Sequence, residues 1–155
     1  MIQSLLVGAG VLLISLLSYG VATAFLVQLV VRLIRSGYDG LALWKNATFM
    51  IVVTFFTAAM HLAQIALWAV AFLGCGEIST FEQAFYLAAQ NYTALGYGDV
   101  ILSPRWRLLG PLEAINGLLL FGLSTAVLFA VMSQLIGNRL RHRVGHPGEA
   151  RVHAS

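Results

Sequence analysis

The chain has 155 residues, of which 59% are hydrophobic and only 10% are charged, with a formal net charge of +3. A soluble domain carries about 25% charged residues, so this composition argues against a water-soluble protein. The sequence contains no Ser/His/Asp catalytic pattern, metal-ligand cluster, phosphate-binding loop or nucleic-acid-binding motif. We therefore expect an all-α membrane protein that is not an enzyme, needs no cofactor and binds no nucleic acid.

The few charges are segregated along the chain. Charged side chains are absent from three stretches, residues 1–31, 46–76 and 114–138, when His61 is neutral. About 20 apolar residues suffice to cross a bilayer, so each stretch is long enough to span.

These stretches predict three transmembrane helices, over residues 3–34, over residues 41–73, and from near Pro111 to near Asn138. The first has no basic residue before Arg32, and its apolar run is longer than that of a cleaved signal peptide. We therefore expect it to be retained. Glu113, near the start of the third, is expected to be a favourable charge at a helix N-terminus.

A shorter helix is expected between the second and third spans, in STFEQAFYLAAQNYT. Ser79 and Glu82 have the S-x-x-E spacing of a capping box. The apolar segment that follows has about 13 residues, which is too few to cross a bilayer, so the helix is re-entrant, interfacial or part of a core. LGYGD then ends it, because each glycine costs about 1 kcal/mol in a helix interior.

The basic residues indicate an orientation. Seven lie in the link between the first two spans and in the C-terminal segment: Arg32, Arg35, Lys45, Arg139, Arg141, Arg143 and Arg151. The positive-inside rule places these residues in the cytoplasm. We therefore predict a multi-pass protein with its N-terminus outside, its C-terminus inside, and the short helix entering from outside. The compact chain without accessory domains favours the plasma (inner) membrane of a prokaryote. The SGYDG segment, residues 36–40, is expected to turn, and the basic tail, residues 139–155, to be disordered.

The alternating glycines of LGYGD suggest a chemistry for the returning strand. Glycine adopts positive φ at little cost, which allows successive carbonyls to point the same way. Several copies of such a strand around an axis would stack rings of carbonyl oxygens, and such rings replace the hydration shell of a cation.

TALGYGD resembles the T-x-G-Y-G-D filter pattern of potassium channels, and residues 41–138 resemble the pore domain of the two-helix potassium-channel superfamily. Residues 1–40 would then add an extra helix and a cytoplasmic turn. The resemblance implies a homotetramer in membrane lipid with passive K⁺ flux. It assigns the filter to Thr93, Ala94, Leu95, Gly96, Tyr97 and Gly98, with K⁺ bound by the backbone carbonyls of Leu95, Gly96 and Tyr97, and Asp99 at the outer mouth.

Ala94 departs from the family pattern, in which threonine usually supplies a hydroxyl to the innermost ion site. Two alternatives therefore stay open beside a potassium-selective channel. One is a weakly selective cation channel, and the other is a non-conducting membrane subunit.

The resemblance also implies supporting roles. Gln90 and Tyr92 would support the filter, with Gln90 bonding near Asp99, and Tyr97 would pack on pore-helix aromatics (Phe85, Tyr86 and Tyr92). Gly117 and Gly122 would be inner-helix hinges, unless these glycines merely allow close packing. Leu118, Phe121 and Thr125 would line the cavity or gate.

Two features lie outside this pattern. His61 and Gln64 are polar residues deep in the second span, where they either sense pH or bond to neighbouring helices. The first helix lacks the repeated arginines of a voltage sensor, and we expect it to lie outside the pore module, facing lipid.

Overall fold

The computed structural model describes residues 2–35 and 43–144, and the regular elements within these ranges are all helices. The helices are α1 (Ile2–Arg35), α2 (Leu43–Gly74), α3 (Phe81–Tyr92) and α4 (Leu109–Val144). Three of them are long and apolar enough to cross a membrane, over Ile2–Arg32, Asn46–Gly74 and Leu109–Gly137. The predicted all-α architecture with three spans and one short helix is confirmed. The predicted turn at residues 36–40 lies outside the described residues.

The start of α3 differs by one residue from the prediction. Thr80, not Ser79, is the N-cap, with extended backbone (φ −122°, ψ 143°) and a side chain that accepts from the Gln83 backbone N–H at 3.4 Å. The capping pattern is therefore Thr80-x-x-Gln83, and the Ser79–Glu82 capping box is wrong. Glu82 instead lies in the first turn, where a negative charge favours the helix dipole.

Both ends of α4 extend beyond the predicted limits. The helix begins at Leu109, so Pro111 is its third residue and still lies in the first turn, where a missing N–H costs nothing. It continues to Val144, so the expected disorder of the tail is wrong for residues 139–144, and residues 145–155 lie outside the described residues. At about 1.5 Å per residue, a helix of 36 residues is longer than the hydrocarbon core of a bilayer.

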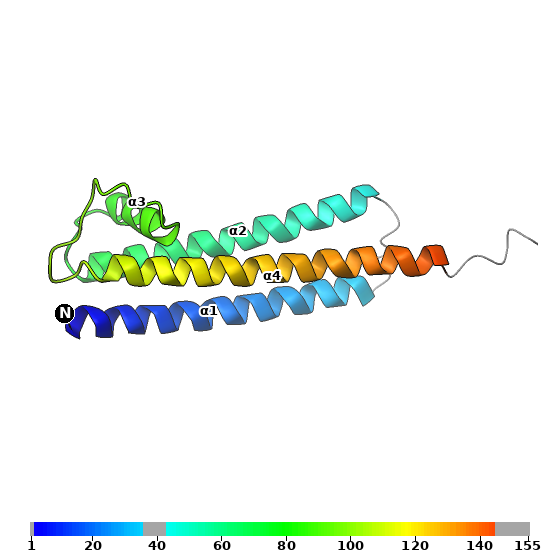
Figure 1. Ribbon diagram of the computed structural model, residues 1–155, viewed down its shortest axis with the longest axis horizontal. Helices are drawn as coiled ribbons and strands as arrows, with labels where there is room; N and C mark the ends of the chain where they lie inside the picture. The colour runs from blue at the N-terminus through cyan, green and yellow to red at the C-terminus, as the bar shows by residue number, and fades with distance from the viewer. Residues whose placement is uncertain (1, 36–42, 145–155) are drawn as a thin grey trace, which may run out of the picture.

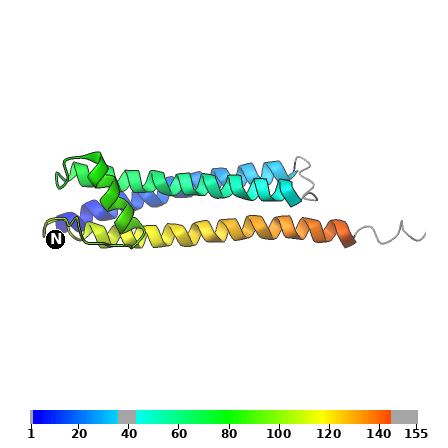
Figure 2. The same cartoon turned by 90° about the horizontal axis from the view of Figure 1, so that it is seen from above.

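The three long helices run side by side, and α3 lies at the end of the bundle where the N-terminus of α1 also lies (Figures 1 and 2). α3 packs against α2 and α4, and α1 packs against both of these long helices. The main core forms where α2, α3 and α4 meet, around Trp68, Phe72, Leu87, Tyr92 and Leu109, all nearly inaccessible. A second apolar cluster joins the far halves of the long helices, through Leu26, Val30, Val53, Val131 and Leu135.

The first helix is not a loosely attached, lipid-facing addition. One of its faces is buried in the bundle, with Ser4 and Ser15 fully covered and Tyr19 only 1% exposed. Its other faces carry exposed apolar residues such as Leu6, Val21 and Phe25. The expectation that α1 lies outside and faces lipid therefore holds for part of its surface and is wrong for the face that carries Ser15 and Tyr19.

Candidate selectivity filter and pore lining

The filter strand begins where α3 ends. The Leu95 N–H donates to the Gln90 carbonyl and the Ala94 N–H donates to the Asn91 carbonyl, both at 2.9 Å. This pair of bonds is the Schellman arrangement that ends many helices, and it requires a left-handed residue between Thr93 and Leu95. Ala94 is that residue, with φ of 56°. Helix termination thus places an alanine in a conformation that usually falls to glycine.

Positive φ angles alternate along the strand that follows. Gly96 has φ of 54° and Gly98 has φ of 76°, and with Ala94 they are the left-handed positions of the segment. Gly96 and Gly98 are therefore left-handed, as predicted. The alternation begins two residues before Gly96, at Ala94, which the glycines alone do not indicate. Thr93 does not present a free hydroxyl to the strand, because its Oγ1 donates to the Ala89 carbonyl at 2.7 Å.

Gln90 contacts both ends of the strand. Its carbonyl accepts from the Leu95 N–H at 2.9 Å and the Gly96 N–H at 3.4 Å. Its side-chain Nε2 donates to Asp99 Oδ1 at 2.9 Å, so the predicted hydrogen bond between Gln90 and Asp99 is present. Tyr86 adds a second donor, with its hydroxyl 2.8 Å from Asp99 Oδ2. One residue of α3 therefore anchors the inner and outer ends of the filter strand.

These donors also favour the ionised form of Asp99, the residue expected at the outer mouth. The hydrogen bonds from Gln90 and Tyr86 lower the pKa of the Asp99 carboxyl below its ordinary value, since they stabilise the ionised form. Asp99 itself is exposed, at the end of the strand away from the C-terminus of α3.

A second carboxylate, Glu77, fixes the loop that follows the filter. Its Oε2 accepts from the Ser103 backbone N–H at 2.7 Å and its Oε1 from the Ser103 hydroxyl at 2.8 Å. The bond ties the loop after α2 to the loop before α4. Sequence reasoning missed this pair, because the two residues are 26 positions apart and neither belongs to a motif.

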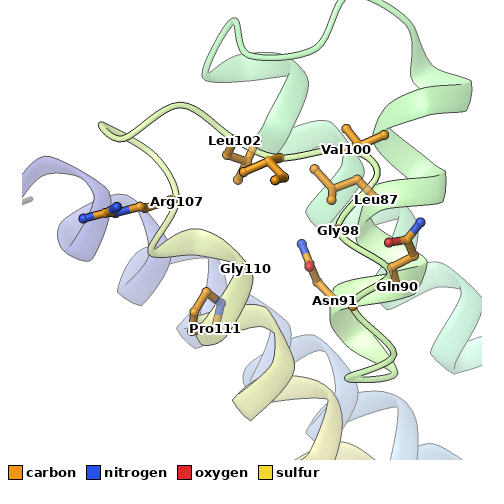
Figure 3. Close-up of a pocket in the computed structure, with 11 residues that line it drawn as sticks. Leu87, Gln90, Asn91, Gly98, Val100, Leu102, Arg107, Gly110 and Pro111 are labelled. Atoms are coloured by element: carbon orange, nitrogen blue, oxygen red, sulfur yellow. The ribbon is translucent and has the colours of Figure 1, made fainter.

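A pocket of about 190 Å³ lies beside the filter strand (Figure 3). It is bounded by the end of α3, the start of α4 and the loop between them. Backbone of Gly96 and Gly98, the amides of Gln90 and Asn91 and the side chain of Arg107 contribute to its lining. Leu87, Val100, Ile101, Leu102 and Pro111 supply the apolar part of the lining, so the strand is backed on this side by a mixed polar and apolar surface.

The inner helix approaches α3 at Gly117. A Cβ there would lie 1.9 Å from the Tyr92 carbonyl oxygen, whereas a Cβ at Gly122 would meet nothing within 4 Å. Close packing is therefore a sufficient reason for Gly117, and its hinge role stays a prediction, as does that of Gly122. Of the expected cavity residues, Leu118 is 60% exposed and Thr125 is also exposed in the single chain.

Phe121 and Tyr92 have partners within the chain. Their rings meet edge-on at 5.4 Å, and the Phe121 ring also stacks on His61 at 4.4 Å. Tyr92 is fully buried and its hydroxyl lies 2.8 Å from His61 Nδ1, while Tyr97 is 69% exposed. Tyr92 therefore supports the end of α3 through α2 and α4. The packing of Tyr97 on Phe85, Tyr86 and Tyr92 stays a prediction.

Glu113 does not lie at an exposed helix start. It is fully buried at the fifth position of α4, on the face that carries Gly110 and Gly117 against α3. Among the described residues, neither of its carboxylate oxygens makes a hydrogen bond of good geometry, and the polar side chain of Asn91 lies near them. The expected favourable charge at the N-terminus is therefore wrong, since the start of α4 is covered by the rest of the bundle.

Comparison with known proteins agrees with this geometry. Residues 58–134 match a family model described as an ion channel, and these residues include α3, the filter strand and most of α4. Together with the relative described below, this match assigns residues 58–134 to the pore-domain potassium-channel superfamily. The family match begins within α2, so α1 lies outside it.

A curated relative narrows the comparison. The "Inward rectifier potassium channel Kirbac3.1" of Paramagnetospirillum magnetotacticum is 31% identical over 78 residues. This match covers 46% of the present chain and 26% of the relative, so the chain spans about a quarter of that protein's length. The comparison with solved structures found no match. The superfamily assignment therefore concerns the pore module, and the functional statements about the whole chain are made as proposals below.

Proposed function

We propose that this protein is a potassium-selective channel that passes K⁺ passively across the membrane. The observation that carries the proposal is the alternation of left-handed residues at Ala94, Gly96 and Gly98, directly after a helix that ends in the membrane-embedded bundle. Such a backbone aims successive carbonyls in one direction, and rings of carbonyls replace the hydration shell of K⁺. In this proposal K⁺ binds to the carbonyls of Leu95, Gly96 and Tyr97.

A ring of carbonyls needs more than one copy of the strand, so the proposal includes a homotetramer. Its support is the exposure of the residues that would face other copies or the pore. Leu95 is 56% exposed, Tyr97 69% and Leu118 60% in the single chain. Exposed apolar side chains on a membrane-spanning bundle are covered either by lipid or by another copy of the chain. The need for several strands in one carbonyl ring favours another copy beside the strand.

Two electrostatic features support cation rather than anion flux. Asp99 is held ionised at one end of the strand by Gln90 and Tyr86. At the other end, the C-terminus of α3 carries about half a negative charge. With the N-terminus and the filter end outside, Asp99 would raise the local concentration of cations at the outer mouth.

Ala94 supports a second candidate, a cation channel of weaker selectivity. The methyl side chain supplies no hydroxyl oxygen at the inner end of the strand, while the backbone carbonyls beyond it are unaffected. Such a channel would lose one ring of ligands and keep the others.

The deciding experiment is a bi-ionic K⁺/Na⁺ recording on the purified full chain in liposomes or planar bilayers. Potassium selectivity predicts a reversal potential that follows the K⁺ gradient and little Na⁺ flux. Equal K⁺ and Na⁺ flux would support the weakly selective channel instead. Absence of flux for either ion under every tested pH and lipid composition would contradict both.

A further inference from the structure

A buried polar network joins all four helices at mid-bundle, outside the filter. Its centre is His61 of α2, which is 9% exposed. Its Nδ1 lies 2.8 Å from the Tyr92 hydroxyl of α3, and its Nε2 lies 2.7 Å from Ser124 Oγ of α4. Ser124 Oγ is also 2.7 Å from the Tyr19 hydroxyl of α1. The end of the pore helix and the inner helix are thus connected through one imidazole, with α1 as a third partner.

The direction of every proton in this network follows from counting donors. Ser124 has one hydroxyl proton, and it is used on the Leu120 carbonyl at 2.6 Å. Ser124 Oγ must therefore accept from both Tyr19 and His61. The His61 proton then sits on Nε2, Nδ1 is the acceptor, and the Tyr92 hydroxyl donates to it. In the opposite tautomer, Ser124 would have to donate to His61 Nε2, so lone pairs of Ser124 Oγ and of the Leu120 carbonyl oxygen would face each other. The Tyr92 hydroxyl would then accept from His61 Nδ1, and its own proton would have no acceptor in the network.

Resting on the proposed channel function, we infer that His61 is a positioning residue that couples the inner helix to the filter. Tyr92, its partner on one side, directly precedes Thr93 and the filter strand. Ser124, its partner on the other side, lies two turns beyond Gly117, where α4 meets the Tyr92 carbonyl. A movement of α4 away from α2 breaks the bond between His61 and Ser124. The end of the pore helix, bonded to the same imidazole through Tyr92, therefore responds to the inner helix.

The first helix stabilises the bond between His61 and Ser124. Tyr19 fills the second acceptor site of Ser124, and its ring lies 5.4 Å from the His61 ring. Below it, Asn116 donates to Ser15 at 2.7 Å and Ser15 donates to Gln64 at 2.6 Å, which again joins α4, α1 and α2. The helix outside the family match therefore supplies polar contacts that hold α4 against the pore module.

The coupling depends on a single proton and is therefore sensitive to pH. An imidazolium carries protons on both nitrogens, so Tyr92 would have to accept at Nδ1 and its own proton would lose its acceptor. The titratable groups that face His61 are Tyr19 from α1 and Tyr92 from α3, and Glu113 of α4 lies close enough to Tyr92 to act on it electrostatically. Acidification that protonates the second ring nitrogen of His61 is expected to change the open probability.

The first test reads the tautomer and does not depend on conduction. The full chain, labelled with ¹⁵N-histidine, is placed in lipid nanodiscs, and the buried His61 signal is identified by its loss in His61→Gln. A protonated Nε2 and an unprotonated Nδ1 at pH 8 are expected. A protonated Nδ1 at pH 8 would overturn the inference. This result stands whether or not the protein passes K⁺, so a failure of the channel proposal is distinguishable from a failure of the coupling.

The second test compares open probability in single-channel recordings. Tyr19→Phe removes only a hydroxyl, and we expect it to shift the ratio of open to closed states about fivefold, the effect of one hydrogen bond, with unitary conductance unchanged. His61→Gln should abolish the pH dependence of the open probability, whereas Glu113→Gln should keep it.

The matched control is Thr57→Val, which removes a buried hydroxyl of α2 that donates to the Val53 carbonyl of its own helix. It should leave the open probability and its pH dependence as in the wild type. A Tyr19→Phe channel with wild-type gating, or a His61→Gln channel with unchanged pH dependence, would overturn the coupling.

Discussion

The filter strand and the His61 network are both polar and both lie within an apolar bundle, but they are stabilised differently. The strand, residues 94–99, is largely exposed in one chain, and its contacts with α3 are few. The network is buried, and each of its hydroxyl and imidazole groups has a partner in the same chain. A single chain therefore completes the network, whereas in the proposed channel it would supply only one strand of the filter.

This difference has a physical cause. A buried polar group without a partner costs roughly 1–3 kcal/mol, so the network has to be satisfied within the subunit that buries it. A filter must instead leave its carbonyl oxygens free for an ion. Substitutions in the strand should therefore act on conduction, and substitutions at the helix contacts on folding and gating.

The largest expected effect is that of Gly96→Ala. Gly96 has φ of 54°, and a left-handed alanine costs about 1–2 kcal/mol per residue, repeated in every subunit. K⁺ flux into liposomes should fall by about tenfold or more, because that cost is borne by the conducting geometry. Gly10→Ala, in α1 with nothing within 4 Å of the added Cβ, is the matched control and should conduct normally. Unchanged flux in Gly96→Ala would favour a non-conducting subunit.

Gly117→Ala should act mainly on stability. Its Cβ would lie 1.9 Å from the Tyr92 backbone oxygen, so α4 has to move away from α3. Overpacking of this kind costs about 1–3 kcal/mol, which denaturant unfolding in detergent would measure. Gly122→Ala, where the added Cβ meets nothing within 4 Å, should be at least as stable as the wild type. Equal stability of the two variants would show that the contact at Gly117 is not tight.

A smaller effect is expected from Gln90→Leu, which sharpens the comparison at the outer mouth. The pKa of Asp99 is depressed, so the carboxylate favours the folded mouth at neutral pH, and this contribution is lost only as pH falls through the depressed value. Without Gln90 the pKa should rise toward its ordinary value, and the acid-induced loss of conduction should begin at a higher pH.

The control for this variant is Gln83→Leu, which removes an exposed amide from the first turn of the same helix. The pH at which this variant begins to lose conduction should match that of the wild type. If Gln90→Leu lost conduction at the same pH as the wild type, the bond between Gln90 and Asp99 would not stabilise the conducting form.

The smallest effect is expected from Ala94→Thr, compared with Ala94→Ser. Both variants add a hydroxyl at the inner end of the strand and should move the bi-ionic reversal potential toward stronger K⁺ selectivity. Only threonine is β-branched at a φ of 56°, so it should cost about 1 kcal/mol more stability. An unchanged reversal potential in both would remove the argument for weak selectivity.

The sequence alone determined the features that depend on local physics. Apolar segments free of charge gave the three spans, and the glycines at 96 and 98 gave the left-handed positions of the strand. Gln90 and Asp99 were paired correctly because they lie only nine residues apart beside one motif.

Only the tertiary structure decided which polar residues meet. His61 stood out in the sequence, but its partners did not. Tyr19 and Ser124 lie 42 and 63 residues away from it, and neither belongs to a motif in its own helix. The burial of α1 and the close contact at Gly117 likewise depend on how the helices pack. At Ala94, the sequence showed only that the hydroxyl of the usual threonine is absent. The left-handed turn that ends α3 explains why a small, unbranched residue suits that position.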